Sequence, residues 1–190
     1  VAMGAGAVAK GYTDKQAPLD SVPTADNTLD LEAVKALFGE GFNDSVAGAF
    51  DKAKNEEGKV HKAHLFVEAC LIKVASDDDG LLPQPKLPKK QTCVVQIYVN
   101  SHELGGTDKS CNGHRYDTMV FCNGMIHAGL ACYPVHYVHS QHDVFFAVME
   151  EMDAILVRCN PGQIKQDGGD QQKFDDAMRA LQAKGKPVWP

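Results

Sequence analysis

The sequence predicts an α/β fold: a small, mainly parallel sheet with helices on both faces over residues 91–190, preceded by an extended arm and a short helical region. Two observations support this prediction. Apolar runs alternate with amphipathic stretches in the order strand, helix, strand, helix, strand, helix, strand, which is typical of right-handed parallel crossovers. The first run, CVVQIYV at 93–99, is apolar almost throughout, as expected of a strand covered on both faces.

The other strands are predicted at 131–139, 154–159 and 186–189, and the helices at 115–129, from Ser140 onward and after Asp170. Pro134 lacks an amide donor, which favours an edge or an irregularity for its strand. Ser140 and Asp143 have the spacing of a helix cap, and Gly185 is placed to end the last helix. We expect the strands at 93–99, 154–159 and 186–189 to be parallel neighbours.

Three segments precede this domain. Residues 1–28 are rich in small and polar residues and show neither a helical nor a strand period, so they form an extended low-complexity arm. Residues 29–80 are helical: Asp30 caps a first helix, a second is expected near Val46 and Phe50, and a third spans 60–74. Residues 81–90, LLPQPKLPKK, read as an extended Pro/Lys linker.

Composition excludes several classes of protein. The net charge of −6 makes a general affinity for nucleic acid or anionic membranes unfavourable. No apolar run approaches the ~20 residues that span a bilayer, so no transmembrane segment is predicted. Four of the six cysteines lie in apolar helix or strand patterns, as buried free thiols do, which favours a reducing compartment such as the cytoplasm or an organelle matrix or stroma. The start at Val1 suggests a processed or truncated polypeptide.

Two short motifs lack the context that their chemistry needs. Gly4–Ala9 matches the dinucleotide pattern GxGxxA, but only three residues precede it and no amphipathic helix follows, so we interpret it as a small-residue tail. Asp77–Gly80 resembles the start of a calcium loop, but the position of the bidentate glutamate is occupied by Pro88. We therefore predict no cofactor at either motif.

Histidines and cysteines crowd the region between residues 102 and 142. Cys111 with His114, and Cys132 with His136, are four potential zinc ligands, but one pair lies in a loop and the other on a strand. The pairing of His127 with Cys122 or Cys132 as a nucleophile lacks a third, orienting group. The sequence therefore predicts neither a bound metal nor a catalytic residue.

The best candidates for a small-molecule site lie in two loops. His102, Gly105 and Gly106 follow the first strand of the sheet, and Asn160 and Gly162 follow the third. Ligands of open parallel sheets bind outside the carboxyl ends of the strands, near a topological switch point. The alternative is that both loops are ordinary connections.

Residues 91–190 also resemble a known family. The run CVVQIYV, the segment DAILVRCNPG at 153–162, and Gly185-Lys186-Pro187-Val188 resemble the N-terminal, pre-ATP-grasp domain of ATP-grasp-type proteins. The resemblance implies a small Rossmann-like domain that packs beside ATP-binding lobes and helps to form the substrate side. The ATP lysine, glycine-rich lid and metal-binding acids of that family would all follow Pro190.

Two functional hypotheses follow. In the first, the protein is a non-catalytic linker or scaffold subunit of a larger assembly, such as a photosynthetic or respiratory complex of an organelle, and contacts other protein chains through the arm 1–28 and the linker 81–90. In the second, it is a fragment of an ATP-grasp-type ligase-like enzyme that lacks its ATP-binding lobes. The first rests on the absence of a catalytic motif, on the low-complexity arm and on the start at Val1, and the second rests on the resemblance.

Overall fold

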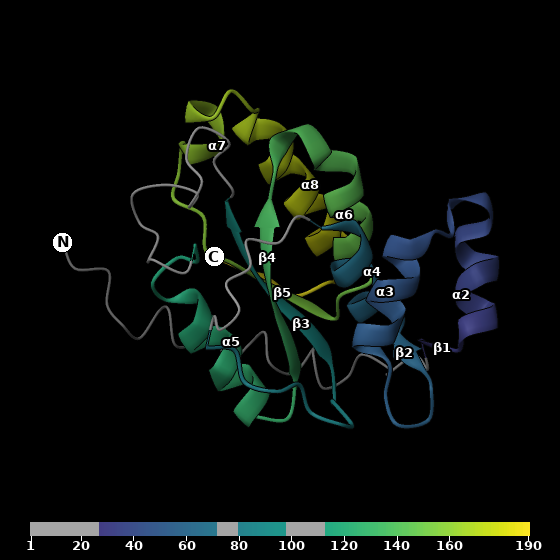
Figure 1. Cartoon of the computed structure of the whole chain (residues 1–190). Helices are drawn as coiled ribbons and strands as arrows, with labels where there is room; N and C mark the ends of the chain where they lie inside the picture. The colour runs from purple at the N-terminus through teal and green to yellow at the C-terminus, as the bar shows by residue number, and fades with distance from the viewer. Residues whose placement is uncertain (1–26, 72–79, 98–112) are drawn as a thin grey trace.

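The structure is a computed structural model and describes residues 27–71, 80–97 and 113–190 (Figure 1). Its helices are α2 (Leu31–Phe38), α3 (Asp44–Ala53), α4 (Lys62–Cys70), α5 (Thr118–His127), α6 (His142–Glu150), α7 (Gln163–Gln166) and α8 (Gln171–Ala183). Its strands are β1 (Thr28–Leu29), β2 (Val60–His61), β3 (Gln91–Ile97), β4 (Ala131–Tyr137), β5 (Ala154–Val157) and β6 (Val188–Trp189). Short 3-10 turns lie at Gly39–Gly41 and His139–Gln141.

The main sheet has four strands in the order β4-β3-β5-β6, and every neighbouring pair is parallel. Cys93 of β3 lies opposite Tyr133 of β4 and Ile155 of β5, and Ile155 lies opposite Val188 of β6. The predicted α/β class is confirmed, as is the parallel pairing of the first, third and fourth strands. Pro134 indeed lies in an edge strand, β4, where a missing amide donor costs the sheet little.

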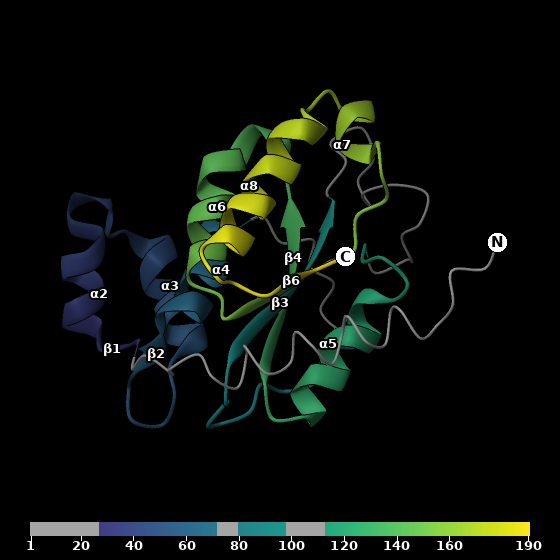
Figure 2. The same cartoon turned by 180° about the vertical axis from the view of Figure 1, so that it is seen from behind.

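Helices cover both faces of the sheet, and alternate residues of β3 point to each of them. On one face Cys93, Val95 and Ile97 join the large apolar cluster that includes residues of α4, α6 and α8. On the other, Val94 packs with Cys122 and Ile126 of α5. Figures 1 and 2 show α5 on one side of the sheet and α4, α6 and α8 on the other. This burial on both faces explains why β3 is apolar almost throughout.

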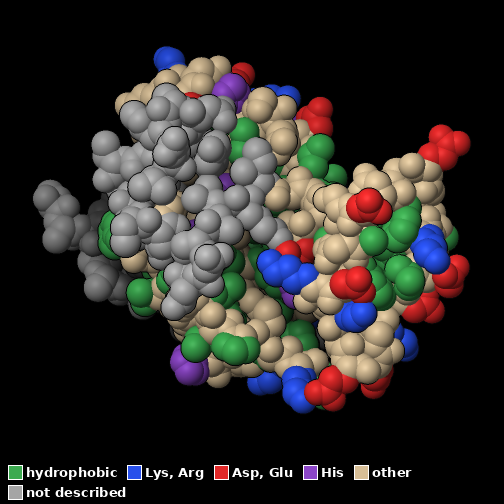
Figure 3. All heavy atoms as spheres, in the orientation of Figure 1, with side chains coloured by type: hydrophobic (Ala, Val, Ile, Leu, Met, Phe, Trp, Pro, Cys, Tyr) green, Lys and Arg blue, Asp and Glu red, His purple; other side chains and the backbone are tan. Residues whose placement is uncertain are grey.

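The helical region 29–80 is tied to the α/β domain through α4. Leu65 of this helix belongs to the small cluster formed with α2 and α3, whereas Ala63 and Val67 belong to the large cluster under the sheet. The third predicted helix therefore packs in both apolar clusters, that of the helical region and that of the α/β domain. On the face in Figure 3, many of the charged side chains gather over the α2–α3 part of the molecule.

This third helix begins later than the periodicity predicts. Val60 and His61 form β2, which pairs antiparallel with Leu29 and Thr28 of β1. The helix then begins at Lys62, with Nδ1 of His61 accepting a hydrogen bond from the N–H of Ala63 at 3.2 Å. An imidazole nitrogen takes the place of the usual capping oxygen here, so the sequence shows no ordinary cap signal.

Most of the predicted helix ends are correct. The carboxylate of Asp30 accepts from the N–H of Ala33 at 2.8 Å, and that of Asp170 accepts from Lys173 at 3.1 Å. The prediction for Ser140 is wrong. Ser140 lies in a 3-10 turn, and α6 begins at His142 after Gln141, which makes no side-chain cap bond. The turn takes up the residues that would otherwise have formed the first turn of the helix.

The Pro/Lys linker packs on its own domain. The N–H of Leu82 donates to Oδ1 of Asn123 on α5 at 2.9 Å. The side-chain amide of Gln84 bonds both backbone groups of Cys132, with Nε2 donating to the carbonyl at 2.8 Å and Oε1 accepting from the N–H at 3.0 Å. Gln84 thus provides hydrogen-bond partners for two backbone groups at the edge of β4.

None of the described helices is both long enough and apolar enough to span a membrane.

Candidate functional site

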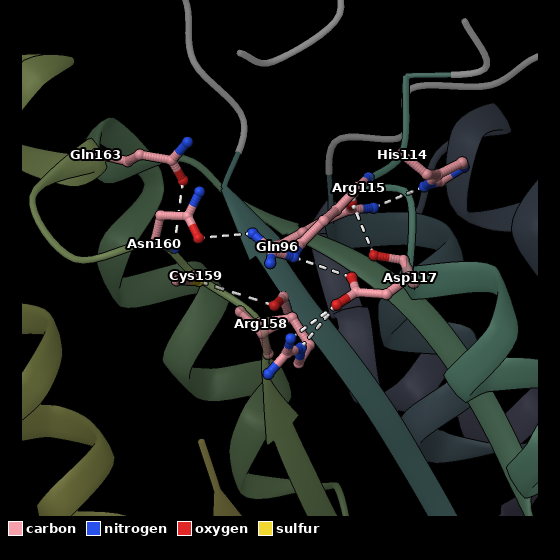
Figure 4. A network of polar contacts seen from close by, with 10 residues as sticks. Gln96, His114, Arg115, Asp117, Arg158, Cys159, Asn160 and Gln163 are labelled. Atoms are coloured by element: carbon pink, nitrogen blue, oxygen red, sulfur yellow. Dashed lines mark hydrogen bonds and ion pairs between the residues drawn. The ribbon is translucent and has the colours of Figure 1, made fainter. Parts of the chain in front are cut away.

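The candidate site lies at the carboxyl ends of β3 and β5 (Figure 4). The chain leaves β3 toward β4 on one side, through α5, and leaves β5 toward β6 on the other side, through α8. The two adjacent strands therefore form the topological switch point of the sheet, where connections diverge and open a crevice. A network of polar side chains occupies this position.

Gln96 is the centre of the network. It is the sixth residue of β3, it is 0% exposed, and it points to the α5 face of the sheet beyond Val94. Its Oε1 accepts from the backbone N–H of Arg115 at 2.6 Å and from the hydroxyl of Thr118 at 3.2 Å. A buried amide in an otherwise apolar strand is stable only because these partners satisfy it.

The other end of the Gln96 amide determines the tautomer of His114. Nε2 of Gln96 and Nδ1 of His114 are 2.6 Å apart. Because an amide nitrogen only donates, Nδ1 of the imidazole accepts, and the proton of the neutral ring lies on its Nε2. The His114 ring lies 5.3 Å from that of His136, centroid to centroid, so two histidines line this end of β3 and β4.

Asp117 holds two arginines. Its Oδ1 accepts from Nε of Arg115 at 2.9 Å. Its Oδ2 accepts from Nη2 and Nε of Arg158 at 2.7 and 3.1 Å. Arg115 is buried, and Asp117 and Arg158 are partly exposed. With two guanidinium groups on one carboxylate, the trio carries an excess of one positive charge.

Aromatic rings cover both guanidinium groups. The Arg115 guanidinium carbon lies 5.1 Å from the ring centroid of Tyr116, and that of Arg158 lies 5.3 Å from the ring of Phe121. Such contacts favour a cation and restrict its orientation. The arginines are therefore fixed by a carboxylate on one side and a ring on the other.

Asn160 joins this network from the loop after β5. Its Oδ1 accepts from Nη1 of Arg115 at 2.7 Å, and its backbone N–H donates to Oε1 of Gln163 at 3.3 Å. Gly162 adopts φ +84°, a left-handed conformation that favours glycine, and α7 begins directly after it. The structure therefore places Asn160 in the site and gives Gly162 the part of a turn residue.

The other predicted site residues fall elsewhere. His102, Gly105 and Gly106 lie outside the described residues, as does Cys111 of the zinc hypothesis. His136 lies near His114, but Cys132 is four residues back along β4 in the apolar cluster around Cys122. Within the part of the chain that the structure describes, no three His, Cys, Asp or Glu side chains are arranged to hold a metal ion. The absence of a metal stays a prediction.

The thiols that the structure describes lie in the apolar clusters or pack against them. Burial raises the pKa of Cys93 well above its usual range. Cys132 differs, because a hydrogen bond with Cys122 lowers its pKa against the effect of burial. Both Cys122 and Cys132 are fully buried on the α5 side of the sheet, whereas His127 is exposed on that helix. The proposed Cys–His pairs are not brought together.

Sequence reasoning named Asn160 and His114 but missed the other residues that form the network. Gln96 interrupts an apolar strand, and Arg158 ends another, and each is a polar residue at the carboxyl end of a buried run. That signal was available. Arg115 and Asp117 carried no comparable signal, because a charged pair at the start of a helix is common.

Comparison with known proteins adds no assignment: neither the family models, nor the curated proteins, nor the solved structures contain a significant match to this chain.

Proposed function

We propose that this protein binds a small anionic molecule at the carboxyl edge of its sheet, over β3 and β5. Arg158 and Arg115 contact the anion, and Asn160 fixes the orientation of Arg115. The observation that supports the proposal best is that Arg158 lies at the topological switch point with its Nη1 in no hydrogen bond among the described residues. Carboxylate and phosphate groups match the planar fork of arginine, and ligands of such sheets bind at this edge.

The charge arrangement favours a ligand over a purely structural ion pair. A buried guanidinium is costly unless hydrogen bonds compensate its desolvation, and among the described residues one carboxylate, Asp117, pairs with both arginines. Within the described residues, Nη1 of Arg158 makes no hydrogen bond, while Nε and Nη2 bind Asp117. A phosphate or carboxylate oxygen at Nη1 of Arg158 would give this nitrogen a hydrogen-bond acceptor. Its negative charge would offset the positive charge of the two arginines and Asp117.

The hydrogen bond between Gln96 and the backbone of Arg115 also supports the proposal, because it makes the position of Arg115 rigid. It holds the backbone of Arg115 from inside the sheet, so the guanidinium is presented by a fixed main chain. Preorganisation of this kind lowers the entropy cost of binding. The proposal is one of binding, and it assigns no reaction.

Calorimetric titration with inorganic pyrophosphate tests the proposal. Arg158→Gln should weaken binding roughly tenfold or more, because it removes a charge-assisted hydrogen bond. Arg179→Gln is the matched control, since Arg179 also pairs with an aspartate, Asp176, but lies on the exposed face of α8. Equal affinities for the Arg158 variant, the control and the unmodified protein would refute the assignment.

A scaffold or linker subunit is the second candidate function, and the outward face of α5 favours it. Val120 and Phe121 of α5 are 71% and 38% exposed, and Tyr116, just before the helix, is 68% exposed. Exposed apolar groups of this kind mark protein contacts. In that role the arm 1–28 would contact other chains, in an organelle complex for example.

Hydrogen exchange distinguishes this role from an arm that folds on its own protein. Amides of residues 1–28 should exchange freely in the purified chain and become protected in its assembly. Protection in the purified monomer would count against the scaffold function. The ATP-grasp fragment stays an alternative prediction, and a reading frame that continues past Pro190 into an ATP-grasp pattern would support it.

A further inference from the structure

A cavity lies at the end of the sheet opposite the carboxyl-edge network. It has a volume of about 780 Å³ and borders Gln91 and Ala131, the first residues of β3 and β4. One wall is the loop between α3 and β2, and the other is the segment 84–90. In Figures 1 and 2 both segments lie at the lower end of the molecule, away from the carboxyl ends of the strands. The volume is in the range of small-molecule sites.

The rim of this cavity is positively charged in a protein that is negatively charged overall. Its lining contains five lysines and three carboxylates, and with Asp51, which pairs with Lys54 from outside the lining, the excess is one positive charge, whereas the whole chain carries −6. Lys54 is neutralised by Asp51 and Lys86 by Glu56, each at 2.7 Å. Within the described part of the chain, Lys59 and Lys89 make no ion pair, so these two ammonium groups are available to a ligand.

The floor of the cavity is rigid, and its polar groups are already bonded to one another. The hydroxyl of Tyr133 donates to Oε1 of Gln91 at 2.6 Å, and the N–H of Gln91 donates to the carboxylate of Asp153 at 2.7 Å. The imidazole of His64 lies 4.8 Å from the Tyr133 ring, centroid to centroid, with a tilt of 32°. The floor therefore offers the partly exposed His64 ring, which is backed by the buried ring of Tyr133, and leaves charge recognition to the rim.

Leu87 marks the mouth of the cavity. It is 91% exposed, and it is flanked by Pro85 and Pro88, whose rings fix φ and stiffen the segment. Across the mouth, Lys86 and Glu56 join the two walls through their exposed ion pair. A large apolar side chain on a stiff segment beside two available cations suits a ligand with an apolar body and an anionic group.

We infer that this cavity is a binding site for a small organic anion. The anionic group is bound by Lys59 and Lys89, and the apolar or aromatic body packs against Leu87 and the His64–Tyr133 surface. The site is separate from the carboxyl-edge network and does not depend on it. Its ligand differs in kind, because ammonium groups act as point charges, without the planar fork of the arginines.

Titration of ¹⁵N-labelled protein with 1-naphthyl phosphate tests the inference. We expect saturable shifts of the amide signals of Asn55, Lys59, Lys89 and Gln91, with little change at Arg115 and Asp117. Neutral 1-naphthol, which lacks the charge, and inorganic phosphate, which lacks the ring, should each bind at least roughly tenfold more weakly. Equal binding of either one, or shifts confined to other parts of the protein, would overturn the site.

Charge variants identify the groups responsible. Lys59→Gln combined with Lys89→Gln should weaken binding of 1-naphthyl phosphate roughly tenfold or more. The control combines Lys173→Gln with Lys184→Gln, two exposed lysines outside the cavity whose removal changes the net charge equally. All four side chains are exposed, so these changes leave the core intact. An equal loss of affinity in both double variants would mean that binding depends only on the overall charge of the protein. That result would refute the assignment.

Discussion

The side-chain oxygen of Gln96, buried in the middle layer of the protein, accepts a hydrogen bond from the backbone N–H of Arg115 at 2.6 Å. This bond ties the end of β3 to the start of the segment that leads into α5. It also determines where the Arg115 guanidinium can reach, since the side chain extends from that fixed backbone to Asp117 and Asn160. A single buried amide therefore positions the charged groups of the carboxyl edge.

Replacing Gln96 with Leu should lower the free energy of unfolding by about 1–3 kcal/mol, because the buried N–H of Arg115 loses its acceptor. Urea denaturation measures the change. Gln172→Leu is the matched control, since Gln172 is exposed on α8 and bonds only Asp176 among the described residues. The control should stay within about 0.5 kcal/mol of the unmodified protein. Similar small losses in both variants would contradict a structural role for the buried amide.

Truncating Ile155 to Ala should lower the free energy of unfolding by about 2–5 kcal/mol. Its side chain is 0% exposed in the large apolar cluster, on a strand that has neighbours on both sides. The comparison is Val144→Ala on α6, where the residue is 46% exposed. A loss below about 1 kcal/mol for Ile155→Ala in a denaturation curve would be incompatible with this packing.

Gln84→Ala should expose the outer edge of β4. Two hydrogen bonds to the backbone of Cys132 are lost, so we expect about 1–3 kcal/mol less stability and faster hydrogen exchange at the Cys132 amide. Gln84→Glu keeps an acceptor for that N–H but loses the donor, and it should give an intermediate effect. Unchanged exchange at Cys132 in the Ala variant would show that the linker does not protect this edge.

His142 should make the stability depend on pH. Its Nδ1 lies 2.8 Å from the Tyr137 hydroxyl, and burial, followed by the nearby Lys173, lowers its pKa below the usual 6.5 in spite of Asp143 and Asp170. The unfolded chain therefore binds a proton more readily than the folded one, so this contribution is fully present above pH 6.5 and declines as the pH falls below it.

The measurement is urea denaturation between pH 7.5 and pH 5. The decline should be smaller in His142→Asn than in the unmodified protein, because asparagine does not titrate. His127→Asn is the control, since that histidine is exposed on α5. An identical pH dependence in His142→Asn and in the unmodified protein would exclude His142 as its source.

The Gln84 contact illustrates why some contacts lie beyond sequence reasoning. Prolines at 83 and 85 predict an extended linker, and segment 81–90 contains neither helix nor strand, with bends at Lys86, Leu87 and Lys89. The same pattern gives no sign that Gln84 satisfies both backbone groups of Cys132, a residue 48 positions away. Propensity acts on neighbouring residues, whereas this contact depends on the path of the whole chain.

By itself, the sequence determined the parallel α/β sheet, the edge position of Pro134, and the caps at Asp30 and Asp170. These features follow from local rules: the periodicity of apolar residues, the missing donor of proline, and short side chains at helix ends. Only the tertiary structure decided which charges meet. Arg158 reaches Asp117 across 41 residues of sequence, and Lys86 reaches Glu56 across 30, because strand order and loop packing bring distant segments together. Charged side chains on the surface carry no periodic signal that would reveal such partners in advance.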